Sequence, residues 1–173
     1  MALLPIITEG DPRLRQKALR IRSAEPGLKS LADDMHETMD AAPGVGLAGP
    51  QVGVMRRIIV VHVPGEFIDE GAPDVRMTLL NPEIVKGHGE EKGLEGCLSI
   101  PGWVGEVKRM TNITVKAMDL NNRNIRIKAE GYFARVLQHE IDHLDGILFV
   151  DRMEEGDELV QDTEDDEIGV AAD

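Results

Sequence analysis

An α+β fold built from antiparallel sheets is the fold class that this sequence predicts, on three observations. Two segments space their apolar residues by three and four positions, which is typical of helices with one buried face. Between them, short runs suited to strands are separated by turn residues, which favours antiparallel over parallel pairing. The length of 173 residues lies within the range of about 100 to 200 residues for one domain.

The elements follow from these patterns in chain order. A first helix is predicted over Pro26–Ala42, and the Gly- and Pro-rich segment 43–51 after it is predicted to be neither helix nor strand. A second helix is predicted over Gly131–Leu144, with Gly146 in the place of a C-cap glycine. The strands predicted between the helices are Arg57–Val63, Met77–Leu80, Glu83–Val85, Asn112–Met118 and Ile125–Ala129.

Charge is distributed unevenly along the chain. The formal net charge is -13, and residues 151–173 hold eleven acidic residues and one arginine, a net -10 that leaves -3 on residues 1–150. We therefore predict a folded domain over 1–150 and an acidic, flexible tail over 151–173. Direct binding of nucleic acid is not expected, because the phosphate backbone repels so acidic a chain and only five residues are aromatic.

The cysteine content and the apolar runs indicate where the protein works. Cys97 is the only cysteine, so an intramolecular disulfide is excluded and secretion is not indicated. The first apolar stretch is interrupted by Pro5 and followed by acidic residues, unlike a signal peptide. No apolar run approaches the ~18 residues of a membrane span. We therefore expect a cytoplasmic protein without membrane association, in which a lone thiol stays reduced and can bind metal.

The second predicted helix contains an H-E-x-x-H pattern over His139–His143. Histidines four positions apart lie one turn apart on the same helix face, so both imidazoles can bind one divalent metal ion. Glu140, next to the first histidine, can lie close to a water at the metal and move its protons. The pattern therefore indicates metal-dependent hydrolysis.

A third ligand decides which kind of metal site this is. The zinc-protease pattern H-E-x-x-H-x-x-G-x-x-H is matched through Gly146, but Phe149 stands where its last histidine belongs. Downstream carboxylates, Glu164 and Glu167, stay open as ligands, although they lie in the acidic tail. Cys97 is the better candidate, because metal coordination would fix its thiol as a thiolate.

Three segments resemble the ordered motifs of the peptide deformylase family. They are Gly44–Gln51 (GVGLAGPQ), Glu95–Ser99 (EGCLS) and Gln138–His143 (QHEIDH), and shorter similarities extend the match to about residues 5–150. The resemblance implies antiparallel sheets packed around a central helix that carries the H-E-x-x-H motif. It also implies a metal-dependent hydrolase that removes the N-formyl group from the N-formylmethionine of nascent polypeptides and releases formate.

For the metal, the resemblance implies that Cys97, His139 and His143 hold one divalent ion per chain and leave a fourth position open to water. It implies Fe(II) in the cell, with Zn(II), Ni(II) or Co(II) as possible substitutes, since a thiolate with two imidazoles suits each of them. Glu140 would take the proton of the attacking water and deliver it to the departing amine.

For the substrate, the resemblance implies that the Gln51 side-chain amide and the Leu98 backbone N–H stabilise the oxyanion. The backbone of Gly46 would hydrogen-bond the substrate, because a residue without a side chain permits close approach. An apolar pocket for the methionine side chain is implied for Val45, Tyr132 and Val136.

Two features near the motifs are expected to matter less for the chemistry. Glu95 and Arg109 resemble a supporting ion pair beside Cys97, and as a surface pair they would contribute under about 1 kcal/mol. Arg135, near the mouth of the expected pocket, could admit a polar substrate residue or point to solvent, and solvent is the favoured prediction. The acidic tail differs from the basic C-terminal helix with which some relatives dock on the ribosome, so ribosome docking is not transferred to this chain.

Two rival functions are weighed against the deformylase. An H-E-x-x-H metallopeptidase would need a histidine in place of Phe149 and would not use Cys97. A catalytically inactive, metal-stabilised binding module would have no need of Glu140 beside its metal. The combination of a base, two oxyanion donors and three ligands favours the deformylase.

Overall fold

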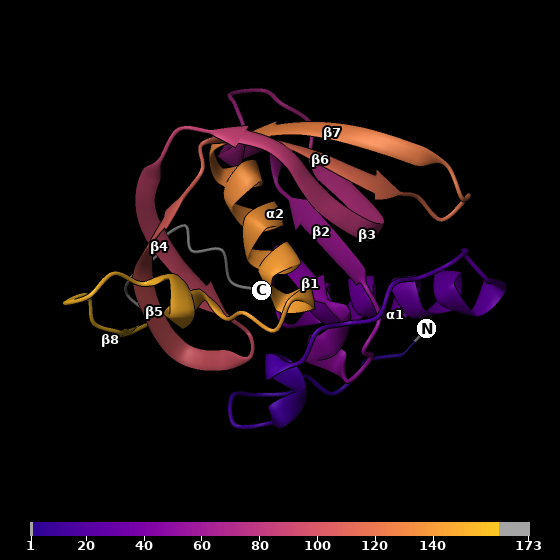
Figure 1. The fold of residues 1–173 in the computed structure, drawn as a ribbon, viewed down its shortest axis with the longest axis horizontal. Helices are drawn as coiled ribbons and strands as arrows, with labels where there is room; N and C mark the ends of the chain where they lie inside the picture. Colours follow the sequence, from indigo (N-terminus) through magenta and orange to yellow (C-terminus); the bar gives the residue numbers. More distant parts are fainter. Residues whose placement is uncertain (1, 163–173) are drawn as a thin grey trace.

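The computed structural model describes residues 2–162, and its architecture is α+β, as predicted (Figure 1). A five-stranded antiparallel sheet has the order β1-β2-β3-β6-β7, and a three-stranded antiparallel sheet has the order β4-β5-β8. Helix α2 lies between the two sheets (Figure 1). The helices and strands are α1 (Pro26–Ala41), β1 (Gly46–Ala48), β2 (Ile58–Val63), β3 (Val75–His88), β4 (Glu91–Cys97), β5 (Ile100–Arg109), β6 (Asn112–Met118), β7 (Asn124–Glu130), α2 (Gly131–Leu144) and β8 (Val160–Gln161), with 3-10 turns η1 (Pro12–Arg15), η2 (Gly49–Val52), η3 (Gly65–Phe67) and η4 (Phe149–Arg152).

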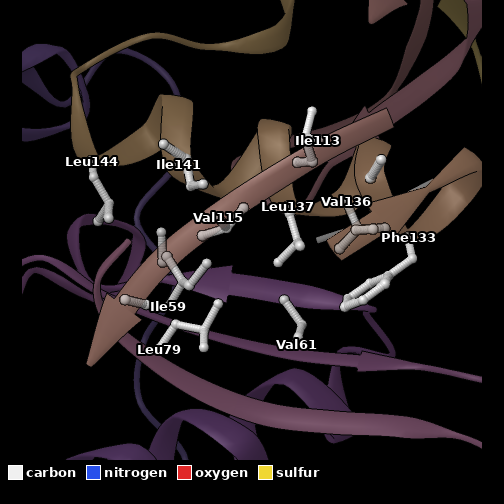
Figure 2. Packing of buried hydrophobic residues seen from close by; sticks show 14 of the residues in the cluster. Ile59, Val61, Leu79, Ile113, Val115, Phe133, Val136, Leu137, Ile141 and Leu144 are labelled. Atoms are coloured by element: carbon white, nitrogen blue, oxygen red, sulfur yellow. The ribbon is translucent and has the colours of Figure 1, made fainter. Parts of the chain in front are cut away.

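Helix α2 has the predicted bounds and packs on the five-stranded sheet. Figure 2 shows Phe133 and Leu137 directed at the sheet, beside Val61 of β2. Each such buried side chain contributes about 1.5–3 kcal/mol to folding. Gly146 follows the helix with φ 75°, and its N–H donates to the His143 carbonyl, which confirms the predicted C-cap glycine. The helix–sheet cluster is Ala18, Ala48, Ile59, Val61, Val63, Leu79, Ile113, Val115, Ala117, Ala129, Phe133, Ala134, Val136, Leu137, Ile141 and Leu144.

Helix α1, which ends one residue before its predicted end, covers the opposite face of the same sheet. Successive side chains of a strand point to opposite faces, so Ile59 and Val61 of β2 face α2 whereas Ile58 and Val60 face α1. Strand β2 is therefore buried on both sides. The α1 cluster is Ile21, Leu28, Ala32, Met35, Met39, Leu47, Ile58, Val60 and Leu80.

Strands β4 and β5 form a hairpin that the sequence does not predict. Its inward positions include the charged side chains of Glu95 and Arg109, which are 0% and 6% exposed. A buried ion pair interrupts the apolar alternation that would reveal a strand, and glycines at 93, 96, 102 and 105 weaken the pattern further. The hairpin cluster is Leu14, Cys97, Ile100, Val107, Leu148 and Phe149.

Two further details differ from the prediction. The segment 43–51 contains the short strand β1, which pairs with β2, and the turn η2 begins within it. The two strands predicted over 77–85 form the single strand β3, interrupted by irregular pairing near Asn81. Asn81 has φ 51°, and its side chain bonds both the N–H and the carbonyl of Ile21. At the point where the regular pairing of β3 is interrupted, this side chain thus ties the strand to the segment before α1.

The predicted boundary between residues 150 and 151 falls within η4. Beyond it, Met153 and Leu159 pack against the hairpin cluster, and β8 pairs with β5. Residues 151–162 of the predicted tail thus contact the folded domain. Residues 163–173 lie outside the described residues, and the division into a catalytic domain and a flexible tail stays a prediction.

Candidate functional site

Three candidate ligands from two separate elements converge beside helix α2. Cys97 ends strand β4, and His139 and His143 lie one turn apart on α2. The Nε2 atoms of the two histidines are 3.2 Å apart, and Cys97 Sγ lies 3.4 Å from His143 Nε2. All three residues are buried, and their ligand atoms lie within 4.8 Å of one another.

These separations fit a tetrahedral metal site. Bonds of about 2.0–2.1 Å to nitrogen and about 2.3 Å to sulfur place two nitrogens about 3.3 Å apart and a nitrogen about 3.6 Å from the sulfur. Burial lowers the pKa of His143 well below its usual range, which keeps the imidazole neutral, as a metal ligand must be. Glu164 and Glu167, the alternative ligands, lie outside the described residues.

Glu140 is a buried carboxylate beside these ligands. It is 0% exposed, and neither of its oxygens has a hydrogen-bond partner among residues 2–162. A Cβ atom at Gly46 would lie 2.7 Å from Glu140 Oε1, so only glycine leaves room for the carboxylate at this position of β1. A buried, unsatisfied carboxylate is costly unless a water, an ion or a substrate bonds it, so it points to a ligand at this place.

Gln51 is held with its amide nitrogen toward the ligand cluster. Its Oε1 accepts the Ala48 N–H at 2.8 Å, and its Nε2 lies 3.6 Å from Cys97 Sγ and 3.2 Å from Ser99 Oγ. The side chain is 0% exposed. Leu98, the other predicted donor, directly follows Cys97, and its side chain packs against the α1 cluster.

The pair of Glu95 and Arg109 is buried, so the prediction of a surface pair was wrong. Arg109 donates two hydrogen bonds of 2.9 Å to the Glu95 carboxylate. Glu95 also accepts a bond of 2.8 Å from His139 Nδ1, and the other ring nitrogen, Nε2, is directed at the cluster. Burial raises the pKa of Glu95, but the bonds from Arg109 and His139 outweigh it and hold that pKa below its usual range.

Two members of this network were missed at the level of sequence. The prediction that Arg135 points to solvent was wrong. Its side chain is buried, at 8% exposure, and donates to Glu95 Oε2 at 2.7 Å. Asp142 accepts bonds from Arg109 at 2.6 Å and from Arg152 at 2.9 Å. Helical spacing could have indicated Arg135, since it lies one turn before His139 on the same face.

The three residues predicted for the methionine pocket all belong to or pack against the helix–sheet cluster. Val136 belongs to the helix–sheet cluster, and Val45 and Tyr132 pack against that cluster while partly exposed. Phe67, which the sequence did not suggest, contacts Tyr132 with ring centroids 5.4 Å apart. Phe149 is buried and stacks on His139 at 6.1 Å between centroids.

Comparisons with known proteins decide the family. The model of the polypeptide deformylase family matches residues 3–158. The chain belongs to the peptide deformylase family. A peptide deformylase of Thermomicrobium roseum is 61% identical over 155 residues, which cover 90% of this chain and 88% of that protein.

Solved peptide deformylases share the fold. A crystal structure of the enzyme from Ehrlichia chaffeensis is 40% identical, with a TM-score of 0.83 over 88% of this chain and 89% of its own. A second structure of that enzyme, in complex with actinonin, is 39% identical, with a TM-score of 0.84 over 90% and 91% of the two chains.

Membership makes this chain a hydrolase that removes the N-formyl group from nascent peptides, as the resemblance implied. The cluster of Cys97, His139 and His143 is consistent with a metal-dependent member of the peptide deformylases. In the described part of the chain, no helix combines the length and the apolar character that crossing a bilayer requires.

Proposed function

We propose that Cys97, His139 and His143 hold one divalent metal ion and that Glu140 carries the protons of the deformylation reaction. The observation that supports this most strongly is the convergence of three buried ligand atoms beside a buried carboxylate that has no partner in the part of the chain that the structure describes. A bound divalent ion would act as a Lewis acid and lower the pKa of a water. The chain itself supplies the base, the oxyanion donors and the positioning.

The protons of the reaction pass through Glu140. Its carboxylate takes a proton from the attacking water and later delivers it to the amine that leaves the formyl carbon. The free oxygens of Glu140 and the space left by Gly46 support this role. Because the carboxylate is buried and shielded from bulk water, its interactions with the reacting atoms are stronger than they would be at the surface.

The negative charge of the tetrahedral intermediate is stabilised by Gln51 and Leu98. The bond from Ala48 orients the Gln51 amide before the substrate arrives, so no reorganisation is needed in the transition state. The Leu98 backbone N–H is the second donor, and the backbone of Gly46 binds the peptide. Glu95 and Arg109 orient His139 and do not touch the substrate.

The substrate is an N-formylmethionyl nascent peptide whose methionine side chain packs against Val45, Tyr132 and Val136. We place the protein in the cytoplasm, where nascent chains emerge. The acidic tail over 151–173 contributes no catalytic group in this proposal, and its charge does not favour docking on ribosomal RNA.

The metal in the cell is Fe(II) in this proposal, and Zn(II), Ni(II) and Co(II) are substitutes. One thiolate and two imidazoles suit all four ions, so the ligand set does not choose among them. Metal analysis of protein purified without oxygen measures the native ion. More zinc than iron in such protein would reject the assignment of Fe(II).

The decisive experiment compares formyl-Met-Ala-Ser with acetyl-Met-Ala-Ser as substrates of the metal-loaded protein. We expect release of formate and no release of acetate. Cleavage of internal peptide bonds would favour the metallopeptidase. That alternative is already disfavoured, because Phe149 stands where the zinc-protease pattern has its last histidine. Metal binding without turnover of either peptide would favour the inactive binding module.

A further inference from the structure

The candidate metal ligands lie in two bodies, the first formed by α2 with the five-stranded sheet and the second by the β4–β5 hairpin with η1 and η4, and each body has its own apolar cluster. His139 and His143 lie on α2, whose apolar face packs in the helix–sheet cluster. Cys97 lies in the hairpin cluster with η1 and η4. Among the described residues, the helix–sheet cluster takes no side chain from β4 or β5, and the hairpin cluster takes none from α2. Figure 1 shows β4 and β5 on one side of α2 and the five-stranded sheet on the other.

Side-chain polar contacts join these two bodies. Glu95 on β4 accepts hydrogen bonds from Arg135 and His139 on α2, and Arg109 on β5 donates to Asp142 on α2. A ring contact between His139 and Phe149 of η4 adds to them. The relative position of the thiol and the two imidazoles therefore depends on directional hydrogen bonds, in addition to apolar packing.

Arg135 contacts both strands of the hairpin. Its Nη1 donates to Glu95 Oε2 at 2.7 Å and to the Val107 carbonyl at 2.8 Å, and its Nη2 donates to the Glu91 carbonyl at 2.7 Å. One guanidinium on α2 thus bonds a side chain and a carbonyl of β4 and a carbonyl of β5. The group also lies over Gly93, where a Cβ atom would be 2.9–3.1 Å from the guanidinium atoms.

We infer that Arg135 is a positioning residue that fixes the cysteine-bearing hairpin against the histidine-bearing helix, so that three ligands meet at one ion. The inference rests on the proposed metal site and assigns Arg135 no contact with substrate. Its planar fork bonds several acceptors at fixed angles, which a lysine cannot do. Without it, two strand carbonyls lose the bonds that Arg135 donates, and Arg109 and His139 are left to bond Glu95.

The test compares Arg135→Met with the matched control Arg57→Met. Arg57 also bonds this helix, through the Leu144 carbonyl at 2.9 Å and Asp145, directly after the helix, at 3.0 Å, but these bonds do not involve β4 or β5. The readouts are the dissociation constant for Co(II), the thiolate-to-cobalt absorption that reports Cys97 ligation, and urea unfolding of the metal-free protein.

We expect Arg135→Met to weaken Co(II) binding by about 10-fold or more and to diminish the thiolate-to-cobalt band. Arg57→Met should lower the unfolding midpoint yet bind Co(II) within about twofold of the wild type. In steady-state kinetics, Arg135→Met at saturating metal should lower kcat more than it raises KM. Unchanged Co(II) affinity and an unchanged spectrum in folded Arg135→Met would overturn the inference.

Two milder variants keep the test decisive if Arg135→Met does not fold. Arg135→Lys retains the charge without the fork, and Gly93→Ala displaces the guanidinium without removing it. Both should weaken Co(II) binding in the same direction, by less than Arg135→Met does. Wild-type affinity in both variants would overturn the inference. A wild-type protein that shows no thiolate-to-cobalt band would instead reject the proposed ligand set, and this inference with it.

Discussion

A single methyl group at Gly46 should impair the reaction without disturbing the metal ligands. In Gly46→Ala, the new Cβ would lie 2.7 Å from Glu140 Oε1 and 2.9 Å from both Cδ and Cγ. Favourable contacts between such atoms are about 3.5–4.0 Å, so the carboxylate has to move by at least about 0.5 Å. Gly46 lies within β1, which is paired with β2, so the side chain is expected to yield before the strand does.

The size of the effect follows from this displacement. A misplacement of about 1 Å can cost about 100-fold in rate, so a shift of half that size should lower kcat by roughly 10- to 100-fold, or about 1.4–2.7 kcal/mol in the barrier. Binding of Co(II) should stay within about twofold of the wild type, because the three atoms nearest the new methyl group all belong to Glu140, which is not a proposed ligand.

The assay is formate release from formyl-Met-Ala-Ser, with Co(II) affinity measured on the same preparations. Gly27→Ala in α1 is the matched control, since a Cβ atom there meets no atom within 4 Å. It should leave kcat and Co(II) binding unchanged. A wild-type kcat in Gly46→Ala would refute the reasoning, and so would a rise in KM alone, which would mean that the methyl group blocks the peptide instead of displacing Glu140.

Cys97→Ala should abolish tight Co(II) binding because it removes a ligand, whereas Glu140→Ala should bind Co(II) and lose turnover by about 100-fold or more; equilibrium dialysis and formate release separate the two, and metal retention by the Cys97 variant would contradict the ligand set. The half-buried His36 has its pKa lowered to about 4, by burial first and then by Arg76, so between pH 6.5 and 4 the unfolded chain binds a proton that the folded protein does not. Stability should therefore fall as pH drops through this window. The full pKa shift corresponds to about 3 kcal/mol, and solvent screening of this half-buried group reduces the expected loss to roughly 1 kcal/mol. Urea unfolding of His36→Gln should show a flatter pH dependence than that of the wild type. A chain that ends at residue 162 should unfold at the wild-type midpoint, whereas one that ends at residue 151 should lose roughly 1–3 kcal/mol with Met153 and Leu159; equal midpoints in urea would show that this segment adds no stability.

The sequence predicts most reliably what a short stretch determines by itself. The period of apolar residues sets both helices within one residue of their observed ends, and the two histidines share a face because they are four positions apart. Cys97 could be selected as a third ligand because a two-histidine pattern without its usual third partner requires another ligand. Each of these arguments needs only local spacing or residue type.

Contacts across long sequence separations are what the sequence conceals. Glu95 is 14 residues from Arg109, 40 from Arg135 and 44 from His139. Nothing in the local pattern shows that four charged or polar side chains will share one buried place. Since charged residues are rarely buried unless paired, the surface was the default expectation for both arginines, and the hairpin was hidden by the same charges.

The buried network follows from the demands of one imidazole. His139 can face the ligand cluster through Nε2 only if Nδ1–H has a fixed acceptor, and Glu95 is that acceptor. A carboxylate at 0% exposure must be compensated by cations, which brings in Arg109 and Arg135. Arg109 is itself buried and has a second carboxylate, Asp142, as its partner. Asp142 also pairs with Arg152, whose side chain is 47% exposed and reaches water, so the series of paired charges ends there. Each buried charge thus requires an oppositely charged neighbour, which explains why the contact between the β4–β5 hairpin and α2 is polar. Stability alone does not demand this, since replacing such a network with apolar residues often costs little stability.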